Sequence, residues 1–427
     1  MDRILIINTY HYLGGGDSTY AFRLADLLQS KGHDVSFFAM QDPGNIHDPN
    51  SDLFVSPIDF QKLNETKSLS GGLRVLGRSI YSTEAKQKFQ NLLDRNNPDV
   101  IHLQSLHGHI TPSVIFVAKN RGLPVVWTIH DYKLICPNSH FLIDSTGEIC
   151  EACGSSAYYQ AVLKRCKKGS LLASGMAAIE AYTHRMLRVR DQVDFFLAPS
   201  RFLRNKLIDR GFDPKKVRHL PLFLPSESFN NSGGHDGYFL YLGKLRELKG
   251  LHVLLKACRL APEIRLILAG PIDERFKDTI TSLLPSNALY VGMKHGEELL
   301  QLIRRAYTIV LPSLTYENQP YSILEAYASG KPVIASDLGG ITELVRRQEL
   351  GVLVSPGDAE ELASAMQWML THCDQVAIMG QAAYEYALSH YEPNDHYRKL
   401  LDIYCGIREN IDNASRDSGP IFLSLQV

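Results

Sequence analysis

TIVLPSLTYENQPYSILEAYASG, residues 308–330, has the pattern of a buried strand, a loop and a helix. The β-branched run TIVLP indicates the strand, while Pro320 suits the first turn of the helix and Gly330 suits its C-terminal stop. Glu317 would then lie in the loop and Glu325 in the first turns of the helix. The segment therefore predicts a strand-to-helix junction, the repeating unit of a parallel α/β sheet.

Short apolar runs alternate with helical or loop segments along both halves of the chain. Continuous apolar strands separated by helices are typical of a parallel sheet that is covered on both faces. The segment 221–237 is rich in Pro, Ser, Asn and Gly, which marks a linker. The sequence thus predicts two Rossmann-like, doubly wound α/β domains that face each other across a ligand cleft. We expect their strands at 4–8, 35–39, 100–104, 125–129, 195–198, 238–242, 265–269, 289–292, 308–312, 332–336 and 351–354.

The junction combines two carboxylates with a helix N-terminus. Backbone amides of Gln319, Tyr321 and Ser322 can point outward there, and with the positive end of the helix dipole they suit a phosphate. Glu317 and Glu325 stand on either side and suit the hydroxyls of a sugar and a ribose. One site could hold both ends of a nucleotide-sugar. The alternative is a solvated loop glutamate beside a helix-face glutamate.

Two further features of the first half point toward the same cleft. The run GGGD at 14–17 opens a helix, and the missing side chains of Gly15 and Gly16 would let a donor or acceptor approach the backbone closely. A tight turn alone would also explain these glycines. The run lacks the G-x-G-x-x-G spacing, which argues against an NAD enzyme. His130 directly follows an expected strand, where it could bind a sugar hydroxyl or serve a structural role.

Lys244 and Lys249 frame a tight turn after the expected strand 238–242. A leaving nucleoside diphosphate gains negative charge, and two cations with a helix N-terminus can neutralise it without a metal ion. The chain has no Asp-x-Asp pair, the metal-binding motif of the other nucleotide-sugar architecture. We therefore expect catalysis without a cofactor, although lysines in such a turn are often only solvated.

Taken in order, these motifs resemble family 4 of the retaining glycosyltransferases, members of glycosyltransferase group 1 with the GT-B fold. ENQPYSILE resembles the E-x7-E signature, and YLGKLRELKG (241–250) resembles the G-R-L-x-x-x-K-G segment. IHDYKLICP (129–137) and SGKPVIASDLGG (329–340) resemble the neighbouring loops. Lys244 stands where the family usually has Arg, so a point charge replaces a bidentate fork. The resemblance covers nearly the whole chain.

The resemblance implies a hexosyltransferase that moves a sugar from a nucleotide-sugar to a hydroxyl acceptor, by front-side attack and with retention of configuration. A phosphorylase of the same fold would need a pyridoxal phosphate lysine site, for which no motif is seen. A non-catalytic nucleotide-sugar-binding module would keep the same pocket. The implied transfer residues are Glu317, Lys249, Lys244 and His130. The implied donor-binding residues are Gly15, Gly16, Gln319, Pro320, Tyr321, Ser322 and Glu325.

The linker, which places a boundary near residue 225, and the resemblance together imply three parts of the chain. An acceptor-side domain is expected at 1–225 and a nucleotide-sugar-binding domain at 226–392. The helix beginning near Pro393 should cross back onto the first domain within the final segment 393–427.

Four of the seven cysteines fall in an insertion of the first domain, at 136–166. A C-x2-C half-site with two flanking cysteines can supply four thiolates to a structural zinc ion. The spacings match no named zinc finger, and four free thiols are the equal alternative. The candidate ligands are Cys136, Cys150, Cys153 and Cys166.

Composition narrows the partners and the compartment. A net charge of −1 gives no field that would recruit nucleic acid. No apolar run approaches the roughly 18 residues that a bilayer-spanning helix needs, and the N-terminus predicts a strand and no signal peptide. An odd number of cysteines in a long chain favours a reducing compartment, so we expect a cytoplasmic protein.

The segment 158–190 mixes basic and apolar residues. It predicts either an ordinary amphipathic helix packed on the first domain or a surface that rests on anionic lipid. The second interpretation suits an enzyme at the inner face of the plasma membrane. Its acceptor would then be a lipid-linked glycan or a surface polysaccharide precursor.

Overall fold

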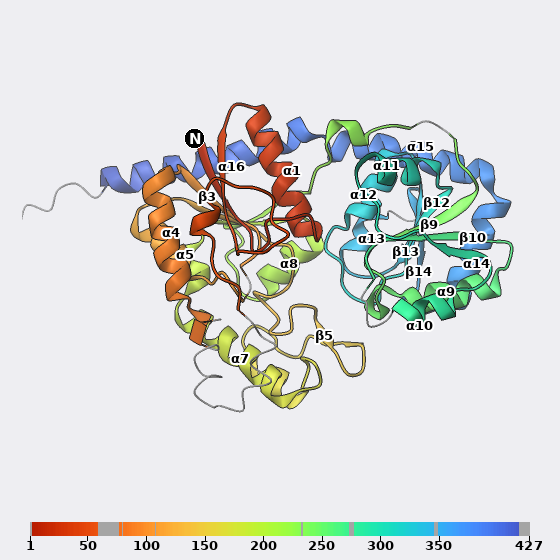
Figure 1. Ribbon diagram of the computed structural model, residues 1–427, viewed down its shortest axis with the longest axis horizontal. Helices are drawn as coiled ribbons and strands as arrows, with labels where there is room; N and C mark the ends of the chain where they lie inside the picture. The colour runs from red at the N-terminus through yellow and green to blue at the C-terminus, as the bar shows by residue number, and fades with distance from the viewer. Residues whose placement is uncertain are drawn as a thin grey trace, which may run out of the picture.

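The computed structural model describes residues 2–58, 77–78, 80–106, 108–231, 234–272, 277–345 and 349–417. Two α/β domains lie side by side, and each is built on a six-stranded parallel sheet (Figure 1). This architecture confirms the predicted pair of doubly wound domains. Its core strands form where the sequence has continuous apolar runs, because helices cover both faces of each sheet.

The first sheet has the order β2-β1-β3-β4-β7-β8. Its order reverses between β1 and β3, and such a switch point opens a crevice at the carboxyl ends of the strands. The helices that follow its strands include α1 (Gly16–Ser30), α4 (Thr83–Asn96), α5 (Ser113–Asn120) and α8 (Arg201–Asp209). The strands are β1 (Arg3–Ile7), β2 (Asp34–Phe38), β3 (Val100–Leu103), β4 (Val125–Thr128), β7 (Phe195–Ala198) and β8 (Val217–His219).

The second sheet has the order β11-β10-β9-β12-β13-β14, with its switch point between β9 and β12. Its strands are β9 (Tyr238–Leu242), β10 (Arg265–Ala269), β11 (Ala288–Tyr290), β12 (Thr308–Leu311), β13 (Val333–Ser336) and β14 (Gly351–Val354). Its helices are α9 (Leu251–Leu260), α10 (Lys277–Leu283), α11 (Gly296–Arg305), α12 (Tyr321–Ala328), α13 (Gly340–Leu344), α14 (Ala359–Thr371) and α15 (Cys373–His390).

Every expected strand is present, with ends shifted by a residue or two. The prediction missed β8, an edge strand whose last two residues are exposed and which therefore lacks an apolar run. It also missed the hairpin of β5 (Leu142–Ile143) and β6 (Glu148–Ile149) in the cysteine insertion. Such short strands carry too little periodicity to be seen in a sequence.

The segment 158–190 forms two helices where a single amphipathic helix was one prediction. α6 (Tyr159–Leu163) and α7 (Leu171–Met186) are separated by a turn in which Arg165 and Lys168 have positive φ angles. Residues in that conformation interrupt a right-handed helix. Within the ranges described, no helix combines the length and the apolar character needed to span a membrane.

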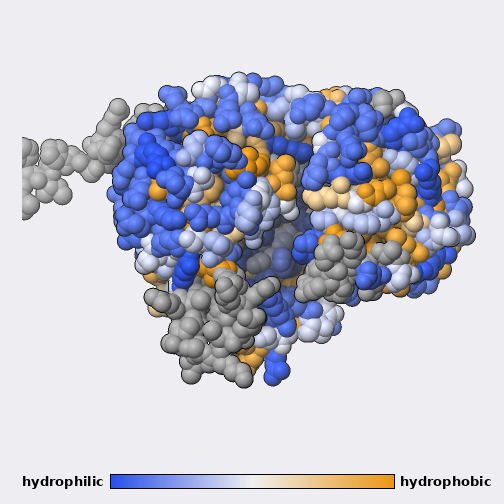
Figure 2. Space-filling model, viewed as in Figure 1, coloured by the Kyte–Doolittle hydropathy of each residue, from blue (hydrophilic) through white to orange (hydrophobic). Residues whose placement is uncertain are grey.

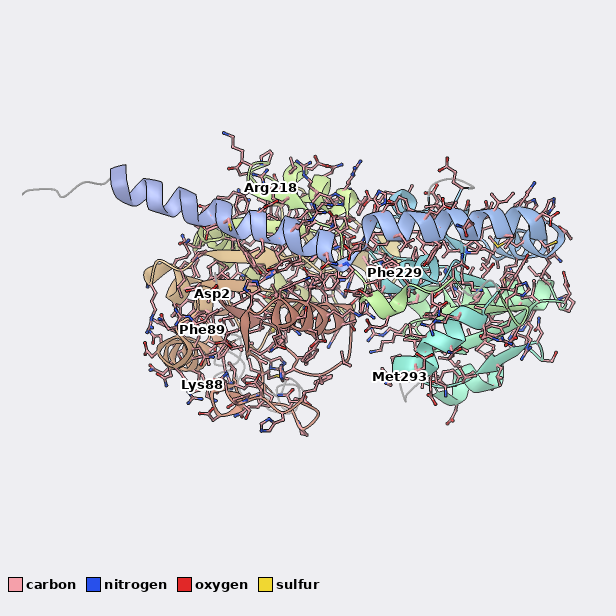
Figure 3. The ribbon with its side chains drawn as sticks, turned by 90° about the horizontal axis from the view of Figure 1, so that it is seen from above. Asp2, Lys88, Phe89, Arg218, Phe229 and Met293 are labelled. Carbon is pink, nitrogen blue, oxygen red and sulfur yellow. The ribbon has the colours of Figure 1, made fainter. Side chains whose placement is uncertain are left out.

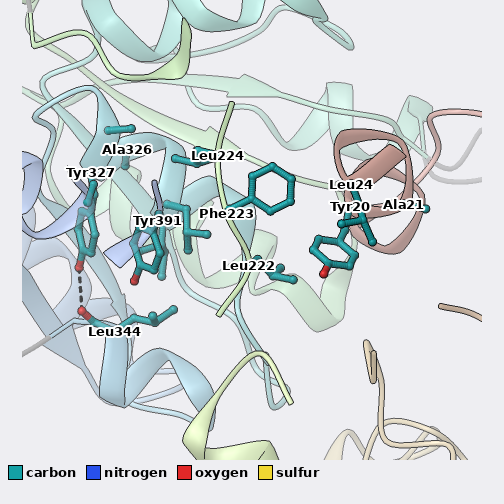
Figure 4. Packing of buried hydrophobic residues seen from close by; sticks show 14 of the residues in the cluster. Tyr20, Ala21, Leu24, Leu222, Phe223, Leu224, Ala326, Tyr327, Leu344 and Tyr391 are labelled. Carbon is teal, nitrogen blue, oxygen red and sulfur yellow. Dashed lines mark hydrogen bonds between the residues drawn. The ribbon is translucent and has the colours of Figure 1, made fainter. Parts of the chain in front are cut away.

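A continuous apolar core joins the two domains at the connection between them. Leu222, Phe223 and Leu224 are buried in one cluster between Tyr20 of α1 and Tyr391 of the second domain (Figure 4). The predicted linker is therefore apolar at its start, although its later part is polar. The two domains share part of one hydrophobic core.

The last helix, α16 (Pro393–Asp417), continues from α15 and lies along the first domain (Figure 3). His396 Nε2 lies 3.0 Å from Tyr20 Oη, and Tyr404 Oη lies 2.6 Å from His102 Nδ1. Burial lowers the pKa of His102 to about 3 and that of His396 to about 4, so both imidazoles are neutral near pH 7. Residues 418–427 of the expected final segment lie outside the described part of the chain.

Candidate active site

A cleft of about 920 Å³ separates the two domains at the carboxyl ends of their strands. Figure 2 shows the hollow between the two lobes. All residues that were expected to act in transfer or donor binding line this cleft, although they come from segments far apart in the sequence. They are Gly15, Gly16, His130, Lys244, Lys249, Glu317, Gln319, Pro320, Tyr321, Ser322 and Glu325.

Glu317 lies in the loop after β12 and is hydrogen-bonded on one oxygen by two side chains. Its Oε1 accepts from Lys249 Nζ, and also from Ser313 Oγ at 2.8 Å. The ion pair with Lys249 is partly screened, because the lysine side chain is 33% exposed and the glutamate 13%. A carboxylate and a cation thus lie together in the lining of the cleft.

A glycine fixes the position of Lys249. Gly250, which follows it, has φ +73°, and a Cβ there would lie 1.7 Å from the carbonyl oxygen of Pro312. Only glycine tolerates both this conformation and this approach. The Lys-Gly pair therefore brings Lys249 beside the loop that follows β12.

Glu325 lies on α12 and takes its counter-charge from the other domain. Arg23 Nη2 of α1 donates to Glu325 Oε1 at 2.8 Å, and the guanidinium lies 4.4 Å from the centre of the Tyr321 ring. Burial disfavours a charged guanidinium, but the carboxylate of Glu325 outweighs it and raises the pKa of Arg23. Arg23 was not predicted, since no local pattern signals a pair separated by 302 positions.

The start of α12 keeps the features of a phosphate site. Pro320 is the N-cap and provides no side-chain acceptor for the first amides of the helix. The positive end of the helix dipole therefore faces the cleft at Tyr321 and Ser322. The side chain of Gln319 has a structural partner, because its Oε1 accepts from the backbone N–H of Leu222 at 2.6 Å.

The loop around Glu317 also reaches the first domain. Asn318 Nδ2 donates to the carbonyl oxygen of Ile129 at 3.0 Å, and Asn318 Oδ1 accepts from Ser200 Oγ at 2.5 Å. Neither Asn318 nor Ser200 was singled out in the sequence. The only local signal was the position of Asn318 inside the E-x7-E segment.

On the opposite wall, His130 follows β4 and its Nε2 lies 2.8 Å from Gln104 Oε1. Asp131 caps the next turn, since its Oδ1 accepts from the backbone N–H of Lys133 at 2.8 Å. Gly15 is the N-cap of α1, and a Cβ on Gly16 would meet no atom within 4 Å. The backbone at Gly16 therefore borders open space that a ligand can use.

The four clustered cysteines lie outside this cleft. Three are buried, Cys150 is partly exposed, and all four are reduced. Burial and the neighbouring thiols Cys136, Cys166 and Cys150 raise the pKa of Cys153 to about 12. No group of three or more His, Cys, Asp or Glu side chains in the described ranges is placed to hold a metal ion. The zinc site stays a prediction, and elemental analysis of protein purified without chelator tests it.

Comparison with known proteins identifies the family. Residues 14–227 match the family described as Glycosyltransferase Family 4, and residues 226–386 match Glycosyl transferases group 1. A Klebsiella pneumoniae protein described as an uncharacterized 42.6 kDa protein in the cps region is 24% identical over 80% of this chain and 87% of its own length. The amylovoran biosynthesis glycosyltransferase AmsK of Erwinia amylovora is 29% identical over 51% of this chain and 57% of its own length.

Solved structures show the same fold. The HepE protein of Anabaena, in complex with UDP and glucose, superimposes with a TM-score of 0.67 at 15% identity and covers 95% of this chain and 100% of its own. Sucrose-phosphate synthase of Thermosynechococcus elongatus has a TM-score of 0.68 at 20% identity and covers 96% and 100%. Both domains, their order and the cleft agree with the predicted GT-B architecture. The chain belongs to family 4 of the group 1 glycosyltransferases and has the GT-B fold.

Proposed function

We propose that this glycosyltransferase moves a hexose from a nucleotide-sugar to a hydroxyl acceptor, with retention of configuration and without a catalytic metal ion. One observation carries the proposal. Glu317, Lys249 and Glu325 line a single interdomain cleft, with the start of α12 between the two carboxylates. The two carboxylates can accept hydrogen bonds from hydroxyls at the two ends of a nucleotide-sugar. The lysine and the helix N-terminus offer positive charge to the diphosphate between them.

The charges in the cleft suit the bond changes of the reaction. The bond from the sugar C1 to the phosphate oxygen breaks, and the acceptor oxygen bonds to C1 on the same face. The acceptor proton passes to the leaving phosphate, so no separate general base is needed. Lys249, Lys244 and the N-terminus of α12 stabilise the charge that develops on the diphosphate. His130 and Glu317 hold hydroxyls of the transferred sugar.

Glu325 is the proposed ribose ligand. Its side chain is 10% exposed and already hydrogen-bonded to Arg23. A ribose hydroxyl must therefore share or replace the bond from Arg23. Donor binding and the contact between domains would then depend on each other.

The first domain, on the proposed acceptor side of the cleft, carries a surface suited to a lipid bilayer. Large apolar side chains are exposed on and near α6 and α7, with Leu163 at 71% and Leu172 at 74%. Lys164, Arg165 and Lys168 are exposed between the two helices, whereas Lys167 is half-buried. Apolar contacts flanked by cations fit an anionic membrane surface. We infer a lipid-linked glycan acceptor, used at the cytoplasmic face of the plasma membrane.

A screen of nucleotide-sugars for thermal stabilisation tests the donor site. A ligand at 100 times its dissociation constant adds about 2.7 kcal/mol to the free energy of unfolding. Incubating the best donor with lipid-linked acceptors and recording the anomeric proton coupling of the product by NMR then tests transfer and retention. An inverted product excludes the front-side mechanism. Binding without transfer to any acceptor favours a non-catalytic module.

Liposome sedimentation tests the membrane surface. Binding should need anionic lipid and fade at high salt, because each Lys or Arg near such a surface contributes about 1 kcal/mol that salt screens. Reversing Lys164, Arg165 and Lys168 to Glu should abolish sedimentation and leave nucleotide affinity unchanged. Equal sedimentation of the variant and the wild type would point to a soluble acceptor.

A further inference from the structure

The residue before Glu317 connects its loop to the cysteine insertion of the facing domain. Tyr316 Oη donates to Glu151 Oε1 at 2.9 Å. Glu151 lies between Cys150 and Cys153, so a single hydrogen bond joins the cysteine-rich segment to the neighbour of a proposed catalytic carboxylate. No role proposed above uses this contact.

Glu151 is held as an anion by two cations of α8. Lys206 Nζ lies 2.6 Å from Oε1, and Arg210 Nη2 lies 3.0 Å from Oε2. The Arg210 side chain is nearly buried, and its guanidinium also donates to the backbone carbonyl of Glu151. The acceptor for Tyr316 is therefore fixed at both its side chain and its backbone.

Aromatic packing orients the Tyr316 ring. Its centre lies 4.9 Å from that of Phe202, 5.9 Å from Phe141 and 6.3 Å from Tyr132, all of them residues of the first domain. Phe141 belongs to the cysteine insertion and adopts a positive φ of 52°. Tilted ring pairs at these separations are favourable, so the Tyr316 ring has a defined position against the facing domain.

The backbone around Glu317 transmits this position to the carboxylate. The N–H of Gly340 donates to the carbonyl oxygen of Glu317 at 2.8 Å, and a Cβ at Gly340 would lie 1.9 Å from the carbonyl oxygen of Asn318. The loop is thus pressed between α13 and the first domain. A displacement of Tyr316 should therefore shift the adjacent Glu317, because the backbone of residues 317 and 318 is in close contact with Gly340.

We propose that the cysteine insertion is a positioning element for glycosyl transfer, in which Glu151 holds Tyr316 and thereby places Glu317 against the acceptor-side domain. The insertion would complete the reacting geometry from the opposite side of the cleft. The effect on transfer rests on the function proposed above, whereas the effect on the loop does not.

The test removes the hydrogen bond while keeping the ring. In Tyr316→Phe, we expect hydrogen–deuterium exchange of the backbone amides between 313 and 320 to become at least tenfold faster. Glu151→Leu, which keeps roughly the side-chain size but removes the acceptor oxygen, should accelerate the same amides. The double variant should be no faster than the stronger single variant, because both changes break one interaction.

A matched control is Tyr238→Phe, which removes the hydrogen bond from a tyrosine hydroxyl to the carbonyl oxygen of Leu302 at the far end of β9. It should leave exchange at 313–320 unchanged. With the donor found in the nucleotide-sugar screen, Tyr316→Phe should lower kcat about tenfold, since small misplacements of reacting groups are costly. Its affinity for UDP, GDP, ADP or TDP, whichever binds the wild type, should stay within twofold.

Two results overturn the proposal. One is unchanged exchange at 313–320 in both variants, which would show that Glu151 does not hold the loop. The other is accelerated exchange with an unchanged kcat, which would make the contact structural only. If the wild type transfers no sugar while the exchange result holds, the proposed function fails and the mechanical link remains.

Discussion

The two carboxylates at the ends of the 317–325 segment obtain their counter-charges from different domains. Glu317 pairs with Lys249 of its own domain, whereas Glu325 pairs with Arg23 of the facing domain. The contacts of Glu317 with its counter-charge are thus set by local backbone geometry around Gly250. Those of Glu325 exist only while the two domains lie together. The proposed transfer end, at Glu317, therefore takes its counter-charge from its own domain, whereas the proposed nucleotide end, at Glu325, takes it from the facing domain.

The largest effect is expected at the proposed transfer end, where Lys249 pairs with Glu317. Lys249→Ala should lower kcat on the order of 10²-fold, because it removes a cation that is proposed to stabilise the leaving diphosphate. Steady-state kinetics measures this, with the exposed Lys256 of α9 replaced by Ala as the control. Activity should also survive EDTA. Loss of activity on chelation, in a protein that stays folded, would show that a metal ion carries the charge instead.

At the proposed nucleotide end, a substitution of Glu325 should change the binding affinity. Glu325→Ala should weaken nucleoside diphosphate binding about ten- to a hundredfold, because a hydrogen bond to a charged group contributes about 1.5–3 kcal/mol. Calorimetry measures the affinity, and Glu385→Ala on the exposed face of α15 is the control. Unchanged affinity in a folded Glu325→Ala variant would remove this residue from the donor site.

Acidification should loosen the contact between domains. The pKa of His396 is lowered to about 4 by burial, so the unfolded state binds the proton first as the pH falls below about 6.5. The contribution of His396 to the free energy of unfolding should therefore be retained above pH 6.5. It should decrease toward pH 4 by at most about 1.4 kcal/mol per pH unit. Denaturant titrations at several pH values measure the slope.

His396→Gln should reduce that slope, since glutamine does not titrate. The pH dependence of nucleotide affinity is a second measurement. Nucleotide affinity should fall with the same pH dependence if Glu325 needs the two domains together, because Tyr20, the partner of His396, lies one turn from Arg23 on α1. A slope that is identical in wild type and variant would place the titrating group elsewhere.

The smallest effect is expected from releasing Glu325. Arg23→Gln should strengthen nucleoside diphosphate binding about fivefold, because the ribose no longer displaces an ion pair that contributes about 1 kcal/mol. Arg259→Gln, at an exposed position of α9, is the matched control. Weaker binding in Arg23→Gln would show that the guanidinium itself holds the nucleotide.

Local patterns predicted the strands, because a buried parallel strand has a continuous apolar run. They also predicted the cleft, because ligands bind at the carboxyl ends of such strands. The lysine turn, the glycine loop and the helix start were predicted in the same way, and they lie together as expected. Long-range pairs could not be predicted. Arg23 looks like any exposed arginine of an amphipathic helix, and Glu151 like a polar residue between two cysteines.

Gln319 shows what a local pattern leaves out. The prediction concerned its backbone amide at the helix start, whereas the structure adds a side-chain bond in which Gln319 Oε1 accepts from the backbone N–H of Leu222. The sequence gives the helix start but not which groups the tertiary structure has already used. For this reason, the residues that join the two domains emerge only from the three-dimensional arrangement.

The helix that returns to the first domain has a consequence for synthesis. α16 follows the whole second domain in the chain, yet Tyr404 and His396 complete the surroundings of His102 and Tyr20. A ribosome makes the first domain long before it makes these partners. The early domain must therefore wait, with part of its apolar surface uncovered, until the last helix emerges. Chaperone capture of a chain truncated before Pro393 would reveal this interval.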